Sequence, residues 1–134
     1  MTTGPSETEA GAISKLSDQT VAQTVDRLLD ILKGNGVQLF AVIDQAAEAR
    51  KVGSQLRDTV LVIFGNPKAG TPVMDAVPLS GLDLPLKLLI WDNDGQTTVS
   101  YYSSETIAQR YVLSEPLRAH LAAIDTVAEA LVAS

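Results

Sequence analysis

The chain has 134 residues and a formal net charge of −6, and 46% of its residues are hydrophobic. This length and composition predict one ordered domain with a single hydrophobic core. The chain has no cysteine, which excludes disulfides, thiolate catalysis and cysteine-ligated metal sites. Its ten Lys and Arg residues are scattered along an acidic chain, so we expect no nucleic-acid partner, because binding to phosphate backbones depends on clustered basic side chains.

The first ten residues, MTTGPSETEA, have no apolar pattern. We expect residues 1–10 to be a disordered leader and residues 11–134 to be a single domain. The N-terminus also lacks the basic region and apolar core of a signal peptide, and no later segment reaches the roughly 18 apolar residues of a membrane-spanning helix. The sequence therefore predicts a cytoplasmic protein with no membrane partner.

Hydrophobic spacing distinguishes helices from strands in the first half of the chain. Apolar residues recur along one face of a helix, whereas they alternate or run continuously in a strand. We expect the strand at 37–43 to have both faces at least partly covered, and the uniformly apolar strand at 60–64 to be central in the sheet. The predicted elements are, in order, a strand at 12–16, a helix with Ser17 or Asp18 as its N-cap and Gly34 as its terminator, a strand at 37–43, a short helix from Asp44 to Arg50, and a strand at 60–64.

Turn residues organise the second half of the chain. Asp94-Gly95 accommodates positive backbone φ and predicts a hairpin. This order of elements predicts an α+β fold, a mostly antiparallel sheet with helices packed on one face in a β-α-β(4)-α-like order. The expected elements are a brief helix at 73–76 capped by Thr71 with Pro72 in its first position, a surface loop from Val77 to Pro85, hairpin strands at 87–91 and 97–102, a helix capped by Ser103 or Ser104, and a last helix from about Glu115.

The segment from Gly65 to Thr71, GNPKAGT, follows a buried strand and precedes a helix, as a phosphate-binding loop does. That motif requires lysine and then serine or threonine directly after its second glycine, whereas here Thr71 follows Gly70 and Lys68 lies inside the loop. We therefore do not expect nucleotide hydrolysis. A weaker anion or polar-ligand site is a hypothesis, since helix N–H groups and the Lys68 ammonium could face one ligand. A rigid turn with no ligand is the alternative.

Other sets of catalytic or metal-binding residues are incomplete. Asp92, Asn93 and Asp94 lack the spacing of a calcium loop. His120 is the only histidine, so one chain cannot supply a two-histidine metal site, and we expect no metal and no cofactor. No His-Ser-acid set is available for nucleophilic catalysis, which leaves carboxylates or lysine as the groups that an enzyme would use.

The aromatic residues of the predicted hairpin are candidates for a binding surface. Trp91, Tyr101 and Tyr102 lie on its two strands, where adjacent residues point to opposite faces. One tyrosine is expected to enter the core. An exposed tyrosine beside Trp91 would contribute to a ligand cleft or a dimer face.

Five segments carry a resemblance to one protein family. They are Ile43-Asp44-x-Ala46-Ala47, Leu56-Arg57-x-Thr59, IFGNPKAGTPVM from Ile63, LPLKLLIW from Leu84 and VSYYS from Val99. From about Ala12 to the C-terminus, the chain resembles the bacterial and archaeal family called domain of unknown function 302. The resemblance implies a compact α+β domain similar in fold to one repeat of the TATA-box-binding protein and often found as a dimer. It implies no established activity, and so no catalytic residue is carried over.

The leading hypothesis is a non-enzymatic small-ligand-binding or interaction domain that forms a homodimer, with a polar or anionic ligand at the segment from Gly65 to Thr71. The alternative is an enzyme that uses carboxylate or lysine chemistry in a cleft formed by that segment, the short helix from Asp44 and the Trp91 hairpin. A third hypothesis is an assembly partner without a ligand. The candidate ligand-binding residues are Asn66, Lys68, Gly70, Thr71, Asp44, Trp91 and Tyr101.

Overall fold

The structure, a computed structural model, describes residues 6–7 and 11–133. Within these residues, one antiparallel sheet has the strand order β1-β2-β6-β5-β4-β3. The predicted leader lies outside the described residues except for Ser6 and Glu7, whose backbone pairs with β2. The strands are β1 (Ser6–Glu7), β2 (Ile13–Leu16), β3 (Gln38–Asp44), β4 (Thr59–Gly65), β5 (Leu86–Asn93) and β6 (Gln96–Tyr101).

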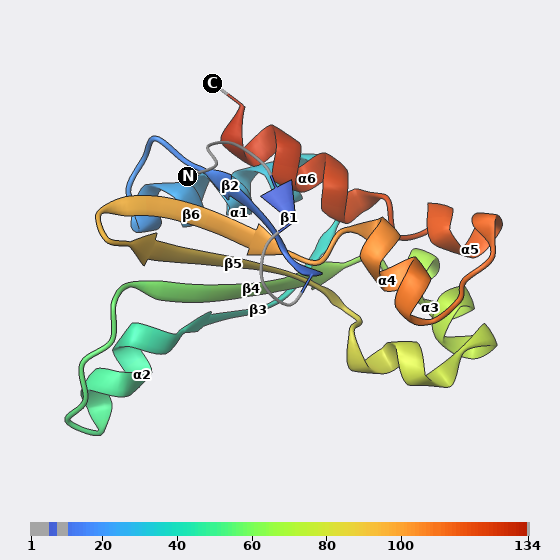
Figure 1. The fold of residues 1–134 in the computed structure, drawn as a ribbon, viewed down its shortest axis with the longest axis horizontal. Coiled ribbons are helices and arrows are strands. Elements are labelled where there is room, and N and C mark those ends of the chain that lie inside the picture. Colours follow the sequence, from blue (N-terminus) through green and yellow to red (C-terminus); the bar gives the residue numbers. More distant parts are fainter. Residues whose placement is uncertain (1–5, 8–10, 134) are drawn as a thin grey trace.

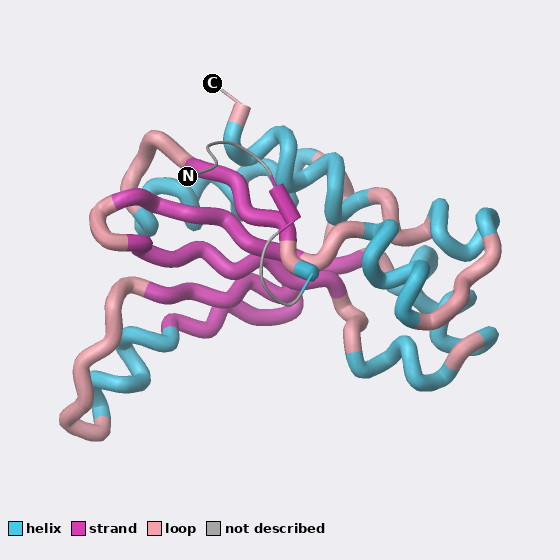
Figure 2. Tube along the Cα trace, in the orientation of Figure 1, coloured by secondary structure: helices cyan, strands magenta, loops and turns pink. Residues whose placement is uncertain are grey.

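The helices occupy three places around the sheet (Figures 1 and 2). Helices α1 and α6 cover one face, α2 projects beyond one end of the sheet, and the remaining helices gather beyond the other end. This arrangement confirms the predicted α+β fold with an antiparallel sheet. The helices are α1 (Val21–Gly34), α2 (Gln45–Lys51), α3 (Pro67–Ala76), the 3-10 helix η2 (Pro78–Leu82), α4 (Ser104–Arg110), α5 (Glu115–Ala119) and α6 (Ala123–Val132).

The hydrophobic core lies between the sheet and helices α1 and α6. Each fully buried aliphatic or aromatic side chain stabilises the fold by roughly 1.5–3 kcal/mol relative to an exposed one. Leu28 and Leu32 of α1 are two of these side chains, and alternate positions of the central strands supply others. Core residues with no exposed surface include Leu28, Val62, Phe64, Leu88, Ile90, Val99 and Ile124.

Helix α1 begins at a capping box rather than at the predicted N-cap. The Thr20 side chain accepts a hydrogen bond from the Gln23 N–H, and the Thr20 N–H donates to the Gln23 side chain, both at 3.1 Å. Two N–H groups at the helix start are satisfied in this way. The prediction of Ser17 or Asp18 as the N-cap is wrong, since the buried Ser17 hydroxyl lies 2.8 Å from the Thr24 hydroxyl.

Strand β3 is the edge of the sheet, and its side chains are only partly buried. Leu39, Phe40 and Val42 are 42–45% exposed, because an edge strand has a neighbouring strand on one side only. These residues and the half-buried Ala41 and Ile43 show that both faces of β3 are only partly covered, within the range that the prediction allowed. Strand β4, by contrast, pairs with β3 and with β5, as expected for an interior strand.

The elements predicted for the second half of the chain are confirmed only in part. Asp94 and Gly95 have φ values of 52° and 94°, which confirms the hairpin between β5 and β6. The single helix predicted from Glu115 is instead two helices, α5 and α6, with the break at His120–Ala122. The predicted loop from Val77 to Pro85 contains η2.

The second face of the sheet has no helix over it among the residues that the structure describes (Figure 1). We call this surface the open face. Strand register places apolar side chains there from three adjacent strands, and all of them are half-buried by one another. The open face includes Ala41, Ile43, Leu61, Ile63, Leu89 and Trp91.

Candidate functional site

The predicted loop after β4 is the first half of helix α3. Asn66 is the N-cap, and its side-chain oxygen accepts a hydrogen bond from the Lys68 N–H at 3.0 Å. Pro67 takes the first helical position, where a missing N–H costs nothing. Thr71 and Pro72 consequently lie inside α3, so the prediction that Thr71 caps the helix is wrong. Both Asn-Pro and Thr-Pro fit an N-cap followed by proline, and the helix starts at the first of them.

The backbone donors at the start of α3 already have partners. The N–H groups of Ala69 and Gly70 both donate to the Asn66 carbonyl at 2.9 Å, and the Lys68 N–H donates to the Asn66 side chain. Pro67 has no N–H. An anion at this helix start would have to displace the Asn66 cap, and this favours an uncharged ligand over an anionic one.

A cavity of about 300 Å³ lies against α3, and we call it the α3 cavity. Its lining is mostly apolar and combines the start of α3 with β3, the residues before β5, and the break between α5 and α6. Asn66, Thr71 and His120 supply polar groups. Lys68 does not belong to the lining. Apolar residues of the lining include Phe40, Met74, Leu84, Pro85, Leu86 and Leu121.

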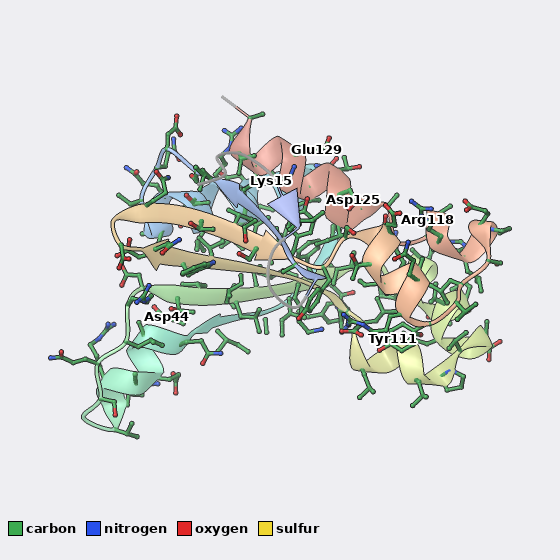
Figure 3. The ribbon with its side chains drawn as sticks, in the orientation of Figure 1. Lys15, Asp44, Tyr111, Arg118, Asp125 and Glu129 are labelled. Atoms are coloured by element: carbon green, nitrogen blue, oxygen red, sulfur yellow. The ribbon has the colours of Figure 1, made fainter. Side chains whose placement is uncertain are left out.

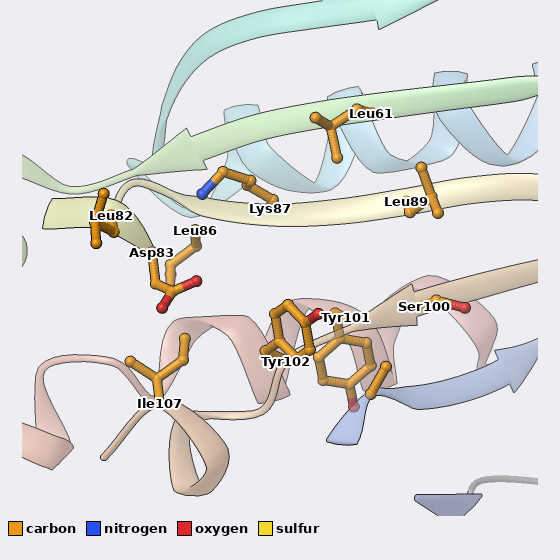
Figure 4. A pocket seen from close by; sticks show the side chains of 11 residues that line it. Leu61, Leu82, Asp83, Leu86, Lys87, Leu89, Ser100, Tyr101, Tyr102 and Ile107 are labelled. Atoms are coloured by element: carbon orange, nitrogen blue, oxygen red, sulfur yellow. The ribbon is translucent and has the colours of Figure 1, made fainter. Parts of the chain in front are cut away.

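A second cavity, of about 380 Å³, opens on the other side of β5, and we call it the Lys87 cavity. Figure 4 shows Lys87 and Asp83 at one end of it and Leu61 and Leu89 toward the other. The Leu86 side chain lines this cavity as well as the α3 cavity. The Lys87 cavity thus has one polar end and one apolar end.

Asp83 ties the end of η2 to helix α4 beside the Lys87 cavity. Its Oδ2 atom accepts hydrogen bonds from the Arg110 guanidinium at 2.9 Å and from the Tyr111 hydroxyl. Burial by itself raises the pKa of Asp83, but the hydrogen bonds from Tyr111 and Arg110 and the positive charges of Arg110 and Lys87 together lower that pKa below its usual value. Asp83 is therefore ionised and already paired with Arg110.

Lys87 is a half-buried lysine in an otherwise apolar strand. Its Nζ donates to the Pro85 carbonyl at 3.1 Å. Burial lowers the pKa of Lys87, and the charge of Asp83 opposes this effect only in part. The Lys87 ammonium is thus held in a poorly solvated position.

The chain is similar to a known protein family and to a solved structure. A family model described as "Domain of unknown function DUF302" matches residues 13–131. The chain belongs to the DUF302 family. A solved structure, "Crystal structure of uncharacterized conserved protein DUF302 from Bacillus stearothermophilus", resembles it with a TM-score of 0.75 and 19% identity, covering 90% of this chain and 94% of that one. At this identity, the likeness shows that the two DUF302 proteins share a fold.

Three curated relatives of this DUF302 domain are 35% identical to it over 106 residues. They are "Fluoride-specific ion channel FluC 1" of Brucella suis biovar 1, the protein of the same name from Brucella abortus biovar 1, and "Fluoride-specific ion channel FluC 2" of Brucella melitensis biotype 1. The match covers 78% of this chain but only 42% of the first relative and 39% of the other two. The DUF302 domain therefore spans about two fifths of their length.

The described part of the DUF302 domain has neither a helix that could span a membrane nor a cluster of metal-binding side chains. None of its helices has the length and apolar character required to cross a bilayer. Its described His, Asp and Glu side chains form no group of three or more that could hold a metal ion.

The predicted ligand-binding residues of the DUF302 domain lie in three separate places. Asn66, Gly70 and Thr71 line the α3 cavity, and Lys68 lies on α3 outside the lining. Tyr101 is 6% exposed and contributes to the Lys87 cavity instead. Burial raises its pKa to about 12, and nearby carboxylates of α6, labelled in Figure 3, add to this shift.

Asp44 and Trp91 lie at the far end of β4 from the start of α3. Asp44 caps α2, as predicted, and pairs with Val60, and Trp91 pairs with Thr59. Five residues of strand, about 17 Å, separate Val60 from Gly65. Figure 3 shows Asp44 near α2 and far from Tyr111, which lies among the helices at the other end. The predicted cleft that joins the Gly65–Thr71 segment to Asp44 and Trp91 is therefore wrong.

The sequence did not indicate Lys87 and Asp83 in the lining of the Lys87 cavity, or Arg110 and Tyr111, which contact Asp83. Asp83 lies in a segment predicted as a surface loop, and Arg110 and Tyr111 lie in and beside a short helix. Their proximity depends on how η2 and α4 pack, which no local pattern reveals. Lys87 was detectable in principle, because it interrupts the apolar run LPLKLLIW.

Proposed function

We propose that this DUF302 domain is a non-enzymatic binding domain whose α3 cavity takes a small uncharged molecule with an apolar ring or chain. The observation that carries this proposal is the cavity of about 300 Å³ with a mostly apolar lining at the rigid start of α3. Small-molecule sites are typically concave, largely apolar and preformed, with volumes from roughly 300 Å³ upward. The side chains of Asn66, Thr71 and His120 give such a ligand hydrogen-bonding partners.

The contacts at the start of α3 favour an uncharged ligand over an anionic one. The first N–H groups of α3 donate to Asn66, and the Lys68 side chain is not part of the lining. Moving an anion from water into an apolar cavity without new donors is unfavourable. An uncharged molecule avoids this cost and still gains from the burial of apolar surface.

Indole, which has an apolar ring and one N–H donor, is a suitable probe for the α3 cavity. We expect indole to shift the backbone amide NMR signals of residues 65–71 in a saturable manner. The variant Gly70→Leu should abolish this response while the protein stays folded. A Cβ at Gly70 would lie 3.7 Å from the Met74 Cε, an ordinary contact, and the longer leucine side chain would then fill the cavity. Leucine is also the better helix former by close to 1 kcal/mol, so we expect no loss of stability.

Gly34→Leu is the matched control, because it places leucine at a helical glycine of α1 that has open space around it. Indole should bind this variant as it binds the wild type. Unchanged signals of residues 65–71 in wild-type protein at saturating indole would refute the proposal. Equal binding by Gly70→Leu and Gly34→Leu would refute the assignment to the α3 cavity.

The names of the Brucella relatives suggest a second ligand for the same titration. Those proteins are named for fluoride, and the DUF302 domain matches about two fifths of their length. We propose that the domain works in the cytoplasm beside such a channel and does not itself bind the ion at α3. Sodium fluoride should therefore leave the signals of residues 65–71 unchanged, and a saturable shift would contradict the uncharged-ligand proposal.

A homodimer formed through the open face is the second function that we propose. The observation that favours it is the run of half-buried apolar side chains across β3, β4 and β5 with no helix over them in the described chain. Contact between two such faces would remove this apolar surface from water. Leu61 and Leu89 also line the Lys87 cavity, so a ligand in that cavity would lie at the dimer contact.

Two adjacent residues of β3 test the dimer. Ile43 pairs with Leu61 on the open face, whereas Val42 pairs with the fully buried Val62 and so lies on the helix side. We expect sedimentation equilibrium to give the mass of a dimer for the wild type and for Val42→Glu, and the mass of a monomer for Ile43→Glu. A wild-type monomer at all accessible concentrations, or an Ile43→Glu dimer, would rule out this interface.

A further inference from the structure

The Lys87 cavity contains an ammonium group with no direct ion-pair partner among the described residues. Among the described residues, the Lys87 ammonium has no carboxylate oxygen within 4.0 Å, and its hydrogen bond goes to the neutral Pro85 carbonyl. Asp83 is the nearby acid, but its carboxylate is already occupied by Arg110 and Tyr111. The charges of Lys87, inside the cavity, and Arg110, outside its lining, therefore both act on the single Asp83 carboxylate.

We propose that the Lys87 cavity binds a small apolar carboxylate, whose head group pairs with the Lys87 ammonium and whose chain lies along Leu61 and Leu89. The register of the sheet puts these three side chains on one surface, since Leu61 pairs with Leu89, and Lys87 lies two residues before Leu89 on β5. Figure 4 shows the apolar and charged ends of this surface. A carboxylate with a short hydrocarbon chain matches both ends at once.

The residues at the polar end favour an anionic head group over a cationic one. An amine would have to compete with Arg110 for Asp83, whereas a carboxylate meets an ammonium that has no carboxylate oxygen of a described residue within 4.0 Å. The Arg110 guanidinium also lies 4.7 Å from the centre of the Tyr102 ring, and this cation–π contact fixes the ring in the lining of the cavity. The head group therefore meets a positive and partly rigid environment.

The position of Lys87 is hard to explain by stability alone. A lysine can place its stem on apolar surface while its charge stays in water, but burial lowers the pKa of Lys87, and this shows that its ammonium is poorly solvated. Residues that cost stability and contact a cavity are typical of binding sites. A bound carboxylate would place a negative charge in direct contact with this ammonium.

Octanoate is the probe for this inference, with 1-octanol as its uncharged analogue. In isothermal titration calorimetry, we expect wild-type protein to bind octanoate about tenfold or more tightly than Lys87→Met does, because a charge-assisted hydrogen bond to a carboxylate is lost. Methionine keeps an unbranched side chain of similar reach. The affinity for 1-octanol should be the same in both proteins.

Lys68→Met is the matched control, since Lys68 is an exposed lysine outside both cavities. This variant should bind octanoate as the wild type does.

Thermal unfolding followed by circular dichroism should give Lys87→Met a midpoint equal to or above that of the wild type. Any loss of octanoate binding would then not result from a loss of folded protein. Equal octanoate affinity in wild type and Lys87→Met, or no binding of millimolar octanoate by folded wild-type protein, would overturn the inference. Because indole reports on the α3 cavity, failure here leaves the proposed function to be judged separately.

Discussion

Phe64→Ala is expected to lower the free energy of unfolding by about 3–5 kcal/mol, the usual loss for a fully buried phenylalanine. Phe64 has no exposed surface and lies in the core on the helix side of β4, directly before the residues that start α3. Removing the ring leaves a cavity that the surrounding strands and helices cannot fill completely. This loss is a large part of the total stability of a typical domain, which is roughly 5–15 kcal/mol. Urea denaturation followed by circular dichroism measures it directly.

Phe40→Ala is the natural control, because the chain has two phenylalanines in contrasting places. The Phe40 ring is 45% exposed and lines the α3 cavity. Its loss should cost less than about 1 kcal/mol, since much of the ring is already in water. Similar losses for the two variants would contradict the assignment of Phe64 to the core.

Asp83→Asn is expected to destabilise the protein by about 1–3 kcal/mol at neutral pH, the cost of weakening hydrogen bonds to a charged group that is largely removed from water. The Asp83 side chain is 18% exposed, and it joins η2 to Arg110 and Tyr111 around α4. Asparagine retains the shape of the side chain but not its charge. Chemical denaturation of both proteins at a series of pH values is the measurement.

The difference in stability between wild type and Asp83→Asn should become smaller as the pH falls. The folded-state pKa of Asp83 lies below the ordinary value of 3.8, so the unfolded chain takes up a proton first as the pH falls. The stabilisation is complete above about pH 5, and it is lost as the pH drops through the folded-state pKa. Wild type and Asp83→Asn should therefore converge in strong acid. Asp30→Asn, on the exposed side of α1, should show no such difference, and a gap that stays constant down to acidic pH would refute the role of the Asp83 charge.

The fold was predictable where local patterns are sufficient. Asp94-Gly95 defined the hairpin because few residues tolerate positive φ, and the apolar stripe of α1 matched its buried residues. Helix starts were harder, since several polar residues in a row can each cap a helix. Ser17 or Asp18 was predicted, whereas the reciprocal bond with Gln23 makes Thr20 the N-cap.

The candidate site was predictable only in part, because it depends on which end of a strand a residue occupies in the folded sheet. Asn66, Gly70 and Thr71 were found from the glycine and proline pattern and do line a cavity. Asp44 and Trp91 were assigned to the same cleft but lie at the far end of β4, a separation set by antiparallel register. The Asp83–Arg110 pair joins residues 27 positions apart, and no spacing in the sequence indicates it.

Leu86 forms part of the wall of both cavities. An occupant that displaces this side chain on one side of β5 changes the shape available on the other side. Two binding equilibria that share a wall are thermodynamically linked, and the linkage is reciprocal: any factor by which the first molecule alters the affinity for the second also applies in reverse. In this domain, Leu86 is thus the residue through which binding in one cavity would change the ligand affinity of the other.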